Sequence, residues 1–226
     1  MTDETTDETT DETTGGTAGE TAGLRERKKA RTRQALSDAA IALFLEHGFD
    51  RVSVADVAAA ADVSKPTLFR YFPTKEDLAL HRIADHQGEA ARVVRARPAG
   101  QPPLAALRTH FHARLDAHDP VTGLTDHPVV RAFHDMLYTT PSLLARLVRY
   151  ADRDEELLAE ALPAADPLLA RLAAAQIVTV HQRLAQENWR KLVSGRPMHE
   201  VLPEAHADVD RAYELLDAGL GERFGR

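Results

Sequence analysis

The chain of 226 residues carries a net charge of −7 and is 43% hydrophobic, so it is long and apolar enough for one large domain or two small ones. The absence of cysteine excludes disulfides, thiolate metal sites and a cysteine nucleophile. No apolar run is long enough to cross a bilayer, and the N-terminus lacks the basic-then-apolar pattern of a secretory leader. We therefore expect a cytoplasmic protein with no membrane partner.

The negative charge is concentrated at the N-terminus. Residues 2–13 are three copies of Thr-Asp-Glu-Thr, and the segment 1–23 holds seven acidic side chains and no Lys or Arg. The rest of the chain is neutral overall, because 35 acids minus these seven leaves 28, the number of Lys and Arg. Since segment 1–23 has no aromatic or large aliphatic side chain to bury, it is predicted to be a disordered tail. The segment is either a passive tail that increases solubility or a segment that competes with DNA for the basic residues that follow it.

A basic cluster comes directly after this tail. Its six cationic side chains are opposed locally only by Glu26, and they are Arg25, Arg27, Lys28, Lys29, Arg31 and Arg33. They stand at the start of a helix predicted over residues 25–47, in which apolar side chains recur every three or four residues and after which Gly48 supplies a left-handed cap. Such a cluster is either a solvated helix end or an electrostatic footprint for phosphates.

Two further helix starts follow, only eleven residues apart. Ser53 can cap a helix over residues 54–61, and Ser64 can cap a second helix over residues 65–72. Because two residues remain to turn the chain between them, the helices must cross steeply and the second one must project outward. This pattern predicts a helix-turn-helix, whose second helix is suited to the major groove of DNA.

Helical patterns continue to the end of the chain, and no segment has the alternation typical of a strand. Thr74 is predicted to cap a fourth helix that runs unbroken toward Arg95, and prolines and a glycine in residues 97–103 mark a linker. Further helices are predicted over residues 104–117, 128–138, 141–162 with Thr140 as cap, 167–193 with Asp166 as cap, and 204–220. The fold is therefore predicted to be all-α, with a head in residues 24–74 and a body in residues 75–226.

The string Val-Ser-Lys-Pro-Thr-Leu-Phe-Arg-Tyr-Phe-Pro-Thr-Lys-Glu-Asp-Leu, which begins at Val63, resembles the TetR family of transcriptional regulators. The likeness runs from Arg31 to Leu78, about a fifth of the chain. It implies a homodimer whose helix-turn-helix heads bind a palindromic operator in double-stranded DNA and whose helical bodies bind a small-molecule effector. One departure is Asp62, where the family usually has glycine, although aspartate tolerates the left-handed conformation at a small cost in stability.

The resemblance also implies which residues meet DNA. The residues assigned to base edges are Lys65, Pro66, Phe69 and Arg70. The residues assigned to phosphates are Ser53, Thr67, Tyr71 and Lys75. Arg31 and Arg33 are assigned to the DNA backbone or the minor groove. Leu68 and Phe72 lie on the opposite side of the same helix, so we expect them in the core of the head.

The body is similar, from Met136 to Leu147 and around Trp189, to a C-terminal domain of actinobacterial regulators, some of which respond to acyl-CoA thioesters. This similarity implies an acyl-CoA-like effector in an apolar pocket, with a cationic side chain for its anionic group. The candidate ligand-binding residues are Arg131, Phe133, Leu137, Arg146, Ile177 and Trp189. The alternative is that these side chains are ordinary core.

Two apolar stripes in the last two predicted helices could form a four-helix dimer interface, because one recognition helix reads too few bases for operator specificity. The first stripe is Leu172, Ile177, Val180 and Leu184. The second is Val209, Ala212, Tyr213, Leu216 and Leu220. Either stripe could equally be an internal core face.

Histidines between residues 110 and 134 give the only hint of metal chemistry. His110 and His112 point about 200° apart on a helix and cannot grip one ion, so we expect no metal and no cofactor. Without a nucleophile triad, phosphate loop or dinucleotide fingerprint, we also expect no enzyme. The leading hypothesis is a repressor whose small-molecule effector shifts the fourth helix. The alternatives are an activator, or a small-molecule-binding or metal-dependent enzyme with a vestigial head.

Overall fold

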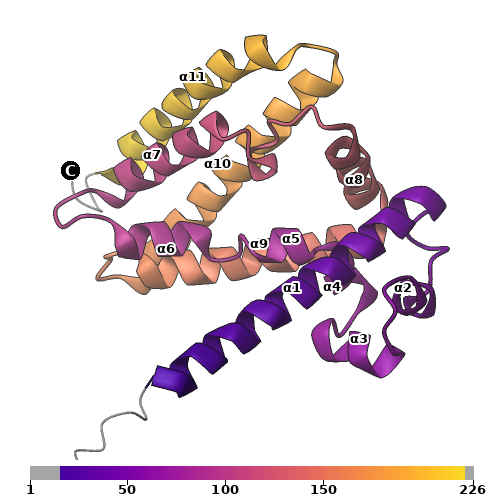
Figure 1. Cartoon of the computed structure of the whole chain (residues 1–226). Helices are drawn as coiled ribbons and strands as arrows, with labels where there is room; N and C mark the ends of the chain where they lie inside the picture. Colours follow the sequence, from indigo (N-terminus) through magenta and orange to yellow (C-terminus); the bar gives the residue numbers. More distant parts are fainter. Residues whose placement is uncertain (1–15, 222–226) are drawn as a thin grey trace, which may run out of the picture.

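The computed structural model describes residues 16–221, and this part of the chain forms eleven α-helices and no strand. The all-α prediction is therefore confirmed. The helices form a small head at the N-terminus and a larger body, which are joined by short helices that pass between them (Figure 1). None of the described helices is long and apolar enough to cross a membrane.

Helix α1 (Gly16–His47) is longer than predicted. Its residues 16–23 belong to the segment that was predicted to be a disordered tail, so that prediction is wrong for them, while residues 1–15 lie outside the described part. Once a helix has formed, each added residue gains a hydrogen bond without the cost of a new nucleus. A helix can therefore extend beyond the residues whose packing stabilises it.

The head consists of α1, α2 (Val54–Ala60) and α3 (Lys65–Tyr71), and α2 and α3 each end one residue before the predicted end. Its buried apolar side chains come from all three helices and the loop after α1, and they include Leu36, Ala40, Phe44, Phe49, Val52, Val57, Leu68 and Phe72. The same buried cluster also contains Leu137 and Leu143. The head core is thus completed by side chains that lie more than sixty residues further along the chain.

The predicted fourth helix is broken into three pieces, α4 (Lys75–Ala79), α5 (His81–Ala84) and α6 (Glu89–Ala96). The prediction of an unbroken rod is wrong. Between α5 and α6 the backbone makes tighter hydrogen bonds to the third residue back, and Gly88 adopts φ of 71°, which a helix cannot contain. The amide of Gly88 donates to Asp154 Oδ1 at 2.7 Å, so a contact with a distant helix holds the break in place.

The body contains the remaining elements: α7 (Pro103–Asp116), a 3-10 turn η1 (Pro120–Thr122), α8 (Pro128–Thr139), α9 (Pro141–Ala161), α10 (Pro167–Val193), α11 (Met198–Leu216) and a π-helical turn η2 (Asp217–Gly221). Helix α10 packs on both α9 and α11, α6 lies along α9, and α7 lies along α11 (Figure 1). Their facing side chains form a second buried cluster, separate from the head core.

Three predicted boundaries in the body can be compared with the structure. Asp166 caps α10 as predicted, because its carboxylate accepts from the amide of Leu168 at 2.8 Å. Thr140 stands at the N-cap position of α9 as predicted, but its side chain makes no cap hydrogen bond there. Helix α11 starts six residues before the predicted start and contains Pro203 as its sixth residue, which cannot donate a hydrogen bond to the carbonyl four residues back.

Candidate nucleic-acid interface

The first helix of the motif, α2, begins with two reciprocal hydrogen bonds. The amide of Asp56 donates to Ser53 Oγ at 3.2 Å, and the amide of Ser53 donates to Asp56 Oδ2 at 2.8 Å. The hydrogen bonds from Ser53 hold the pKa of Asp56 below its usual value. This capping box fixes where α2 starts, as the sequence predicts.

The turn between α2 and α3 is closed by a left-handed residue. The amide of Val63 donates to the Ala58 carbonyl at 3.0 Å, and the amide of Asp62 donates to the Ala59 carbonyl at 3.2 Å. Asp62 itself has φ of 51°, the conformation that the sequence requires of it. This hydrogen-bond pattern is a Schellman motif, and it turns the chain sharply enough to start a new helix two residues later.

Helix α3 presents a mixed basic and aromatic surface to the outside. Ser64 caps it, because its Oγ accepts from the amide of Thr67 at 3.2 Å. Leu68 and Phe72 are buried in the head core, as predicted. The side chains that remain exposed are Lys65, Pro66, Phe69 and Arg70. Phe69 leaves 46% of its surface in solvent, which is unusual for phenylalanine and indicates a surface made for contact.

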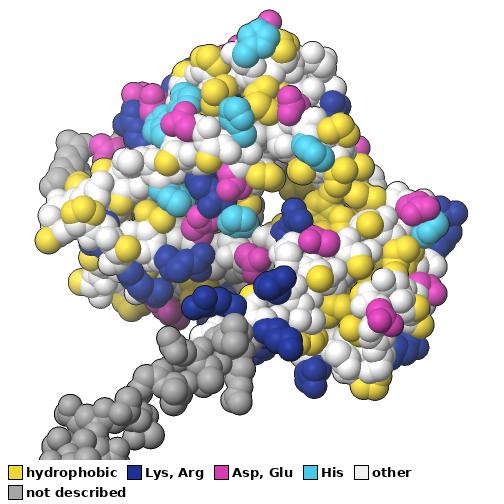
Figure 2. Space-filling model, viewed as in Figure 1, with side chains coloured by type: hydrophobic (Ala, Val, Ile, Leu, Met, Phe, Trp, Pro, Cys, Tyr) yellow, Lys and Arg dark blue, Asp and Glu magenta, His cyan; other side chains and the backbone are white. Residues whose placement is uncertain are grey.

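The start of α1 and the end of α3 share a basic depression, a hollow of about 440 Å³ lined by Lys28, Lys29, Thr32, Arg70 and Tyr71. Within it the Arg70 guanidinium lies 5.6 Å from the Tyr71 ring centroid, which restricts the reach of both side chains. Lys and Arg side chains gather where α1 passes α3 (Figure 2). The basic cluster of α1 and the exposed surface of α3 therefore form one positive face.

Two residues assigned to DNA are held inside the head instead. The Lys75 ammonium donates to the Phe49 carbonyl and lies 4.2 Å from the Phe49 ring centroid, and burial lowers the pKa of Lys75. The Arg33 guanidinium lies 5.3 Å from the Phe72 ring centroid, and its Nε is buried without a partner among the described atoms. The family resemblance implied that both residues lie near DNA, but it carried no information on these contacts.

The candidate ligand-binding residues do not line one pocket. Phe133 and Leu137 pack in the head core, Ile177 is buried in the body core, and Arg146 pairs with Asp77 Oδ1 at 2.5 Å. Trp189 stacks on His134 with ring centroids 3.7 Å apart. Three of the six residues, Phe133, Leu137 and Ile177, thus pack in or against a core, on neighbouring helices that the sequence could not identify.

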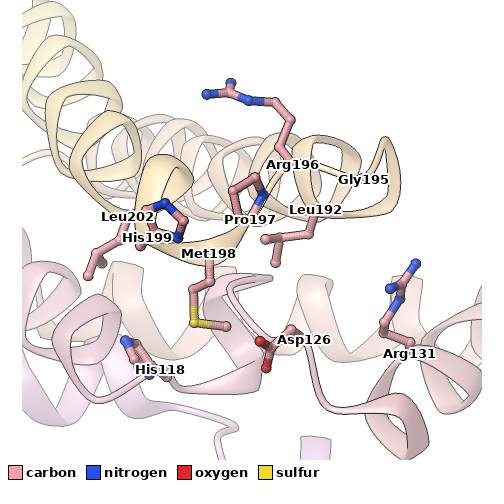
Figure 3. A pocket seen from close by; sticks show the side chains of 10 residues that line it. All are labelled: His118, Asp126, Arg131, Leu192, Gly195, Arg196, Pro197, Met198, His199 and Leu202. Carbon is pink, nitrogen blue, oxygen red and sulfur yellow. The ribbon is translucent and has the colours of Figure 1, made fainter.

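Arg131 borders a hollow of about 550 Å³ between the α10–α11 loop and the segment before α8. The other lining residues are His118, Asp126, Leu192, Gly195, Arg196, Pro197, Met198, His199 and Leu202. Met198 points between His118 and Asp126, whereas Arg196 points away (Figure 3). Arg196 is held by Glu204 through hydrogen bonds of 2.6 and 2.9 Å, which leaves Arg131 as the available guanidinium.

A partly buried polar network lies at the break between α5 and α6, and it was not predicted from the sequence. The Glu89 carboxylate contacts His86 Nδ1 and His110 Nε2, both at 3.0 Å, and the Arg114 guanidinium. Burial alone would raise the pKa of Glu89, but the two histidine hydrogen bonds and the Arg114 charge hold it far below its usual value. We call Glu89, His86, His110 and Arg114 the Glu89 latch.

The remaining histidines support no metal site in the part of the chain that the structure describes, where no three His, Asp or Glu side chains are placed to hold an ion. His110 faces Glu89, whereas His112 faces His206 with Nδ1 atoms 2.6 Å apart. The two neighbours thus point to different partners, as their spacing predicts.

The fold and the α3 surface define a helix-turn-helix DNA-binding protein. A model of bacterial regulatory proteins of the tetR family matches residues 36–81. The chain is 34% identical over 142 residues to the HTH-type transcriptional regulator TcmR of Streptomyces glaucescens, a match that covers 62% of this chain and 63% of that protein, slightly less than two thirds. It is 31% identical over 196 residues to the HTH-type transcriptional repressor LfrR of Mycolicibacterium smegmatis, covering 85% of this chain and 92% of that one.

The arrangement of helices is similar to that of a solved bacterial repressor. The crystal structure of NalD, the secondary repressor of the MexAB-OprM multidrug efflux pump in Pseudomonas aeruginosa, superposes with a TM-score of 0.50 at 19% identity and covers 85% of this chain and 97% of that one. At this identity the likeness shows the fold alone. The chain belongs to the TetR family: it is a transcriptional regulator that binds operator DNA and responds to small-molecule effectors, and it is not an enzyme.

Proposed function

We propose that this regulator is a homodimeric cytoplasmic repressor that binds a palindromic operator through α3 and is released by an amphipathic, anionic effector. The observation that carries the proposal is the outer surface of α3, where Lys65, Phe69 and Arg70 are exposed next to the basic depression while Leu68 is fully buried behind them. A rigid helix with its apolar side buried and its basic side exposed is suited to a major groove.

The exposed residues of α3 divide into two groups of contacts. Lys65, Pro66, Phe69 and Arg70 face base edges, with the two apolar side chains suited to thymine methyl groups and Arg70 to the two acceptors of guanine. Ser53, Thr67, Tyr71 and Arg31 lie at the edge of this surface and bind phosphates, which sets register and supplies affinity. We assign Arg33 and Lys75 a positioning role, because their cationic groups brace the head core beneath α3.

Dimerisation uses the outer face of α10 and α11. The predicted stripes are mostly internal, because Ile177, Leu184, Val209, Tyr213 and Leu216 are buried in the body core. Three leucines on these helices remain exposed, Leu168, Leu172 and Leu215, with Leu215 leaving 77% of its surface in solvent. An exposed apolar face on two long adjacent helices is suited to a second copy, and two-fold symmetry then matches a palindromic operator.

The effector binds in the cavity that Arg131 borders. Leu192, Met198 and Leu202 supply an apolar wall there, and Arg131 supplies a positive charge at the rim. A molecule with an apolar part and an anionic group satisfies both features. An acyl-CoA thioester is one molecule of this class.

Effector binding reaches the head through the Glu89 latch. Helices α4 to α6 join the head to the body, and the break between α5 and α6 is held by Glu89 and by the bond from Gly88 to Asp154. Because α4, α5 and α6 are separate helices, they transmit motion from the body to the head only while the contacts of Glu89 and the bond from Gly88 to Asp154 are intact. A ligand that changes the packing of α7, which carries His110 and Arg114, therefore changes the placement of the head.

The DNA-binding part is tested by footprinting the purified protein on its native chromosome, followed by anisotropy titrations on the protected duplex. We expect a protected palindrome with half-sites about 34 Å apart. Arg70→Ala should weaken operator binding by about 10- to 100-fold, the value of one bidentate base contact. Val148→Ala, which truncates an exposed apolar side chain on α9, should leave operator affinity unchanged. Equal affinities for the two variants would overturn the assignment of α3.

The effector part is tested by mass spectrometry of ligand retained after gentle purification. We expect an amphipathic anion that lowers operator affinity, and we expect Arg131→Gln to weaken its binding while Arg171→Gln, an exposed arginine on α10, does not. In Glu89→Gln the ligand should still bind but release DNA less completely. A retained ligand that binds without changing operator affinity would contradict the proposed switch.

A further inference from the structure

The cations of the basic depression lack strong partners in the folded protein. Among the side chains that the structure describes, neither Lys28 nor Arg70 has an ion-pair partner, and Lys29 meets Glu26 only at 3.9 Å with both groups well exposed. An exposed pair of that kind contributes little. The start of α1 therefore presents a net positive surface beside α3.

The complementary charge lies in the same chain, immediately before α1. Residues 2–13 carry six acids and no base, and they are Asp3, Glu4, Asp7, Glu8, Asp11 and Glu12. Residues 25–33 carry six bases and one acid, a net charge of +5. The two segments are thus nearly equal and opposite in charge, and each is concentrated in about ten residues.

The acidic segment is long enough to reach the basic depression. Twelve residues of α1 separate Gly16 from Lys28, a span of about 18 Å along a helix. Chain that precedes Gly16 can extend at most about 3.5 Å per residue, so Glu8, eight residues back, has a maximum reach of about 28 Å. Glu8 and the acids before it can therefore fold back onto Lys28, Lys29 and Arg70.

We propose that the Thr-Asp-Glu-Thr segment occupies the basic depression of its own chain in the DNA-free protein and leaves when DNA binds. This inference rests on the proposed function, because the depression is part of the proposed DNA surface. A segment tethered this closely acts at an effective concentration in the millimolar range, so even weak charge pairing gives substantial occupancy. Since the segment must leave before any duplex binds, it lowers operator and non-operator affinity by the same factor and limits the time spent on bulk DNA.

The affinity test compares the full chain with charge variants on the operator and on a random duplex. Deleting residues 2–13 should tighten binding to the operator and to the random duplex by about 3- to 10-fold at 50 mM salt. This gain in affinity should be smaller at 300 mM salt, because the charges are screened. The triple change Glu4→Gln, Asp7→Asn and Glu8→Gln, which removes acids that can reach the depression, should give part of that gain. Its matched control is Glu200→Gln, Glu214→Gln and Asp217→Asn, which alters net charge equally on and just after α11, away from α3 (Figure 1).

We expect no gain from the α11 control. If the control and the tail variant tighten DNA binding equally, net charge is the cause and the proposal fails. If the deletion leaves affinity unchanged at low salt, the proposal fails while DNA binding stands. If neither protein binds any duplex, the proposed function fails first.

A direct test requires no DNA. A photoreactive side chain placed at Thr9 of the full chain should crosslink to α1 or α3 near Lys28 and Arg70 in the same subunit, and added operator should suppress the crosslink. Crosslinks that form only between subunits, or only on the body, would overturn the proposal.

Discussion

The head and the body of this regulator are specified in different ways. In the head, Ser53 and Ser64 start two helices, and Asp62 turns the chain between them, so the geometry follows from residues a few positions apart. In the body, the break before α6 and the placement of η1 depend on partners more than sixty residues away. Local rules therefore build the surface that reads DNA, and long-range contacts build the part that responds to a ligand.

The largest expected effect probes a long-range contact of the body. Gly123 follows η1 with φ of 71°, and a Cβ there would lie 1.9 Å from the carbonyl oxygen of Ala185 in α10. Nearby, Asn188 Nδ2 donates to the Thr122 carbonyl at 2.9 Å. Gly123→Ala should lower the free energy of unfolding by about 4 kcal/mol, because neither backbone can yield without breaking this contact. Chemical denaturation measures the change.

Gly100 is the matched control for this prediction. It also has a positive φ, of 81°, but nothing lies within 4 Å of its Cβ position. Gly100→Ala should therefore cost only about 1 kcal/mol, the backbone term alone. If both glycines tolerate alanine equally, η1 is not held against α10 as described.

The next effect concerns a partly buried histidine on α8. The ring of His134 stacks on Trp189 and lies tilted against Tyr138, its Nδ1 is buried without a partner among the described atoms, and burial lowers its pKa to about 4. The unfolded chain takes up this proton near its usual pKa of about 6.5, so between these values it binds more protons than the folded chain. Acidification through this window should therefore destabilise the fold, by at most about 1.4 kcal/mol per pH unit for one group.

His134→Phe should make the unfolding free energy less steep between pH 6.5 and 4, since it removes one titrating group and keeps the stack. Urea titrations at several pH values measure the slope. An unchanged slope in this variant would show that His134 titrates normally in the folded protein.

The smallest effect returns to the local turn of the head. Asp62 has φ of 51°, and glycine removes the strain of that conformation but adds freedom to the unfolded chain. Asp62→Gly should change the free energy of unfolding by less than about 1 kcal/mol. A loss above 2 kcal/mol would mean that the aspartate side chain itself holds the turn.

The elements and caps of the head were predictable because they depend on neighbours in the sequence. Ser53, Ser64 and Thr74 cap their helices as expected, and Leu68 and Phe72 face the core. The break at Gly88 was missed, because a single glycine within a helical pattern gives no sign of the distant Asp154 that accepts its amide hydrogen bond.

At the candidate DNA-binding site, exposure on one helix could be predicted from the sequence, whereas contacts with other elements could not. Exposure of Lys65, Phe69 and Arg70 followed from helix periodicity, whereas the inward contact of Lys75 with Phe49 could not be read from spacing. The candidate ligand-binding residues are dispersed for a similar reason, and their role stays a prediction. Apolar residues such as Leu137 and Ile177 carry no label that separates a core position from a pocket wall, and only the packing of helices decides between them.

The interrupted path from α4 to α6 has a consequence for how this regulator can evolve. A single unbroken helix in place of α4, α5 and α6 would transmit any displacement of the body to the head, whichever ligand caused it. The interrupted segment α4–α6 passes on only those displacements that act on the contacts of the Glu89 carboxylate with His86, His110 and Arg114. Under the proposed switch, the response to a new compound can be gained or lost by substitutions at these four residues, without change in the head or in the walls of the proposed effector cavity.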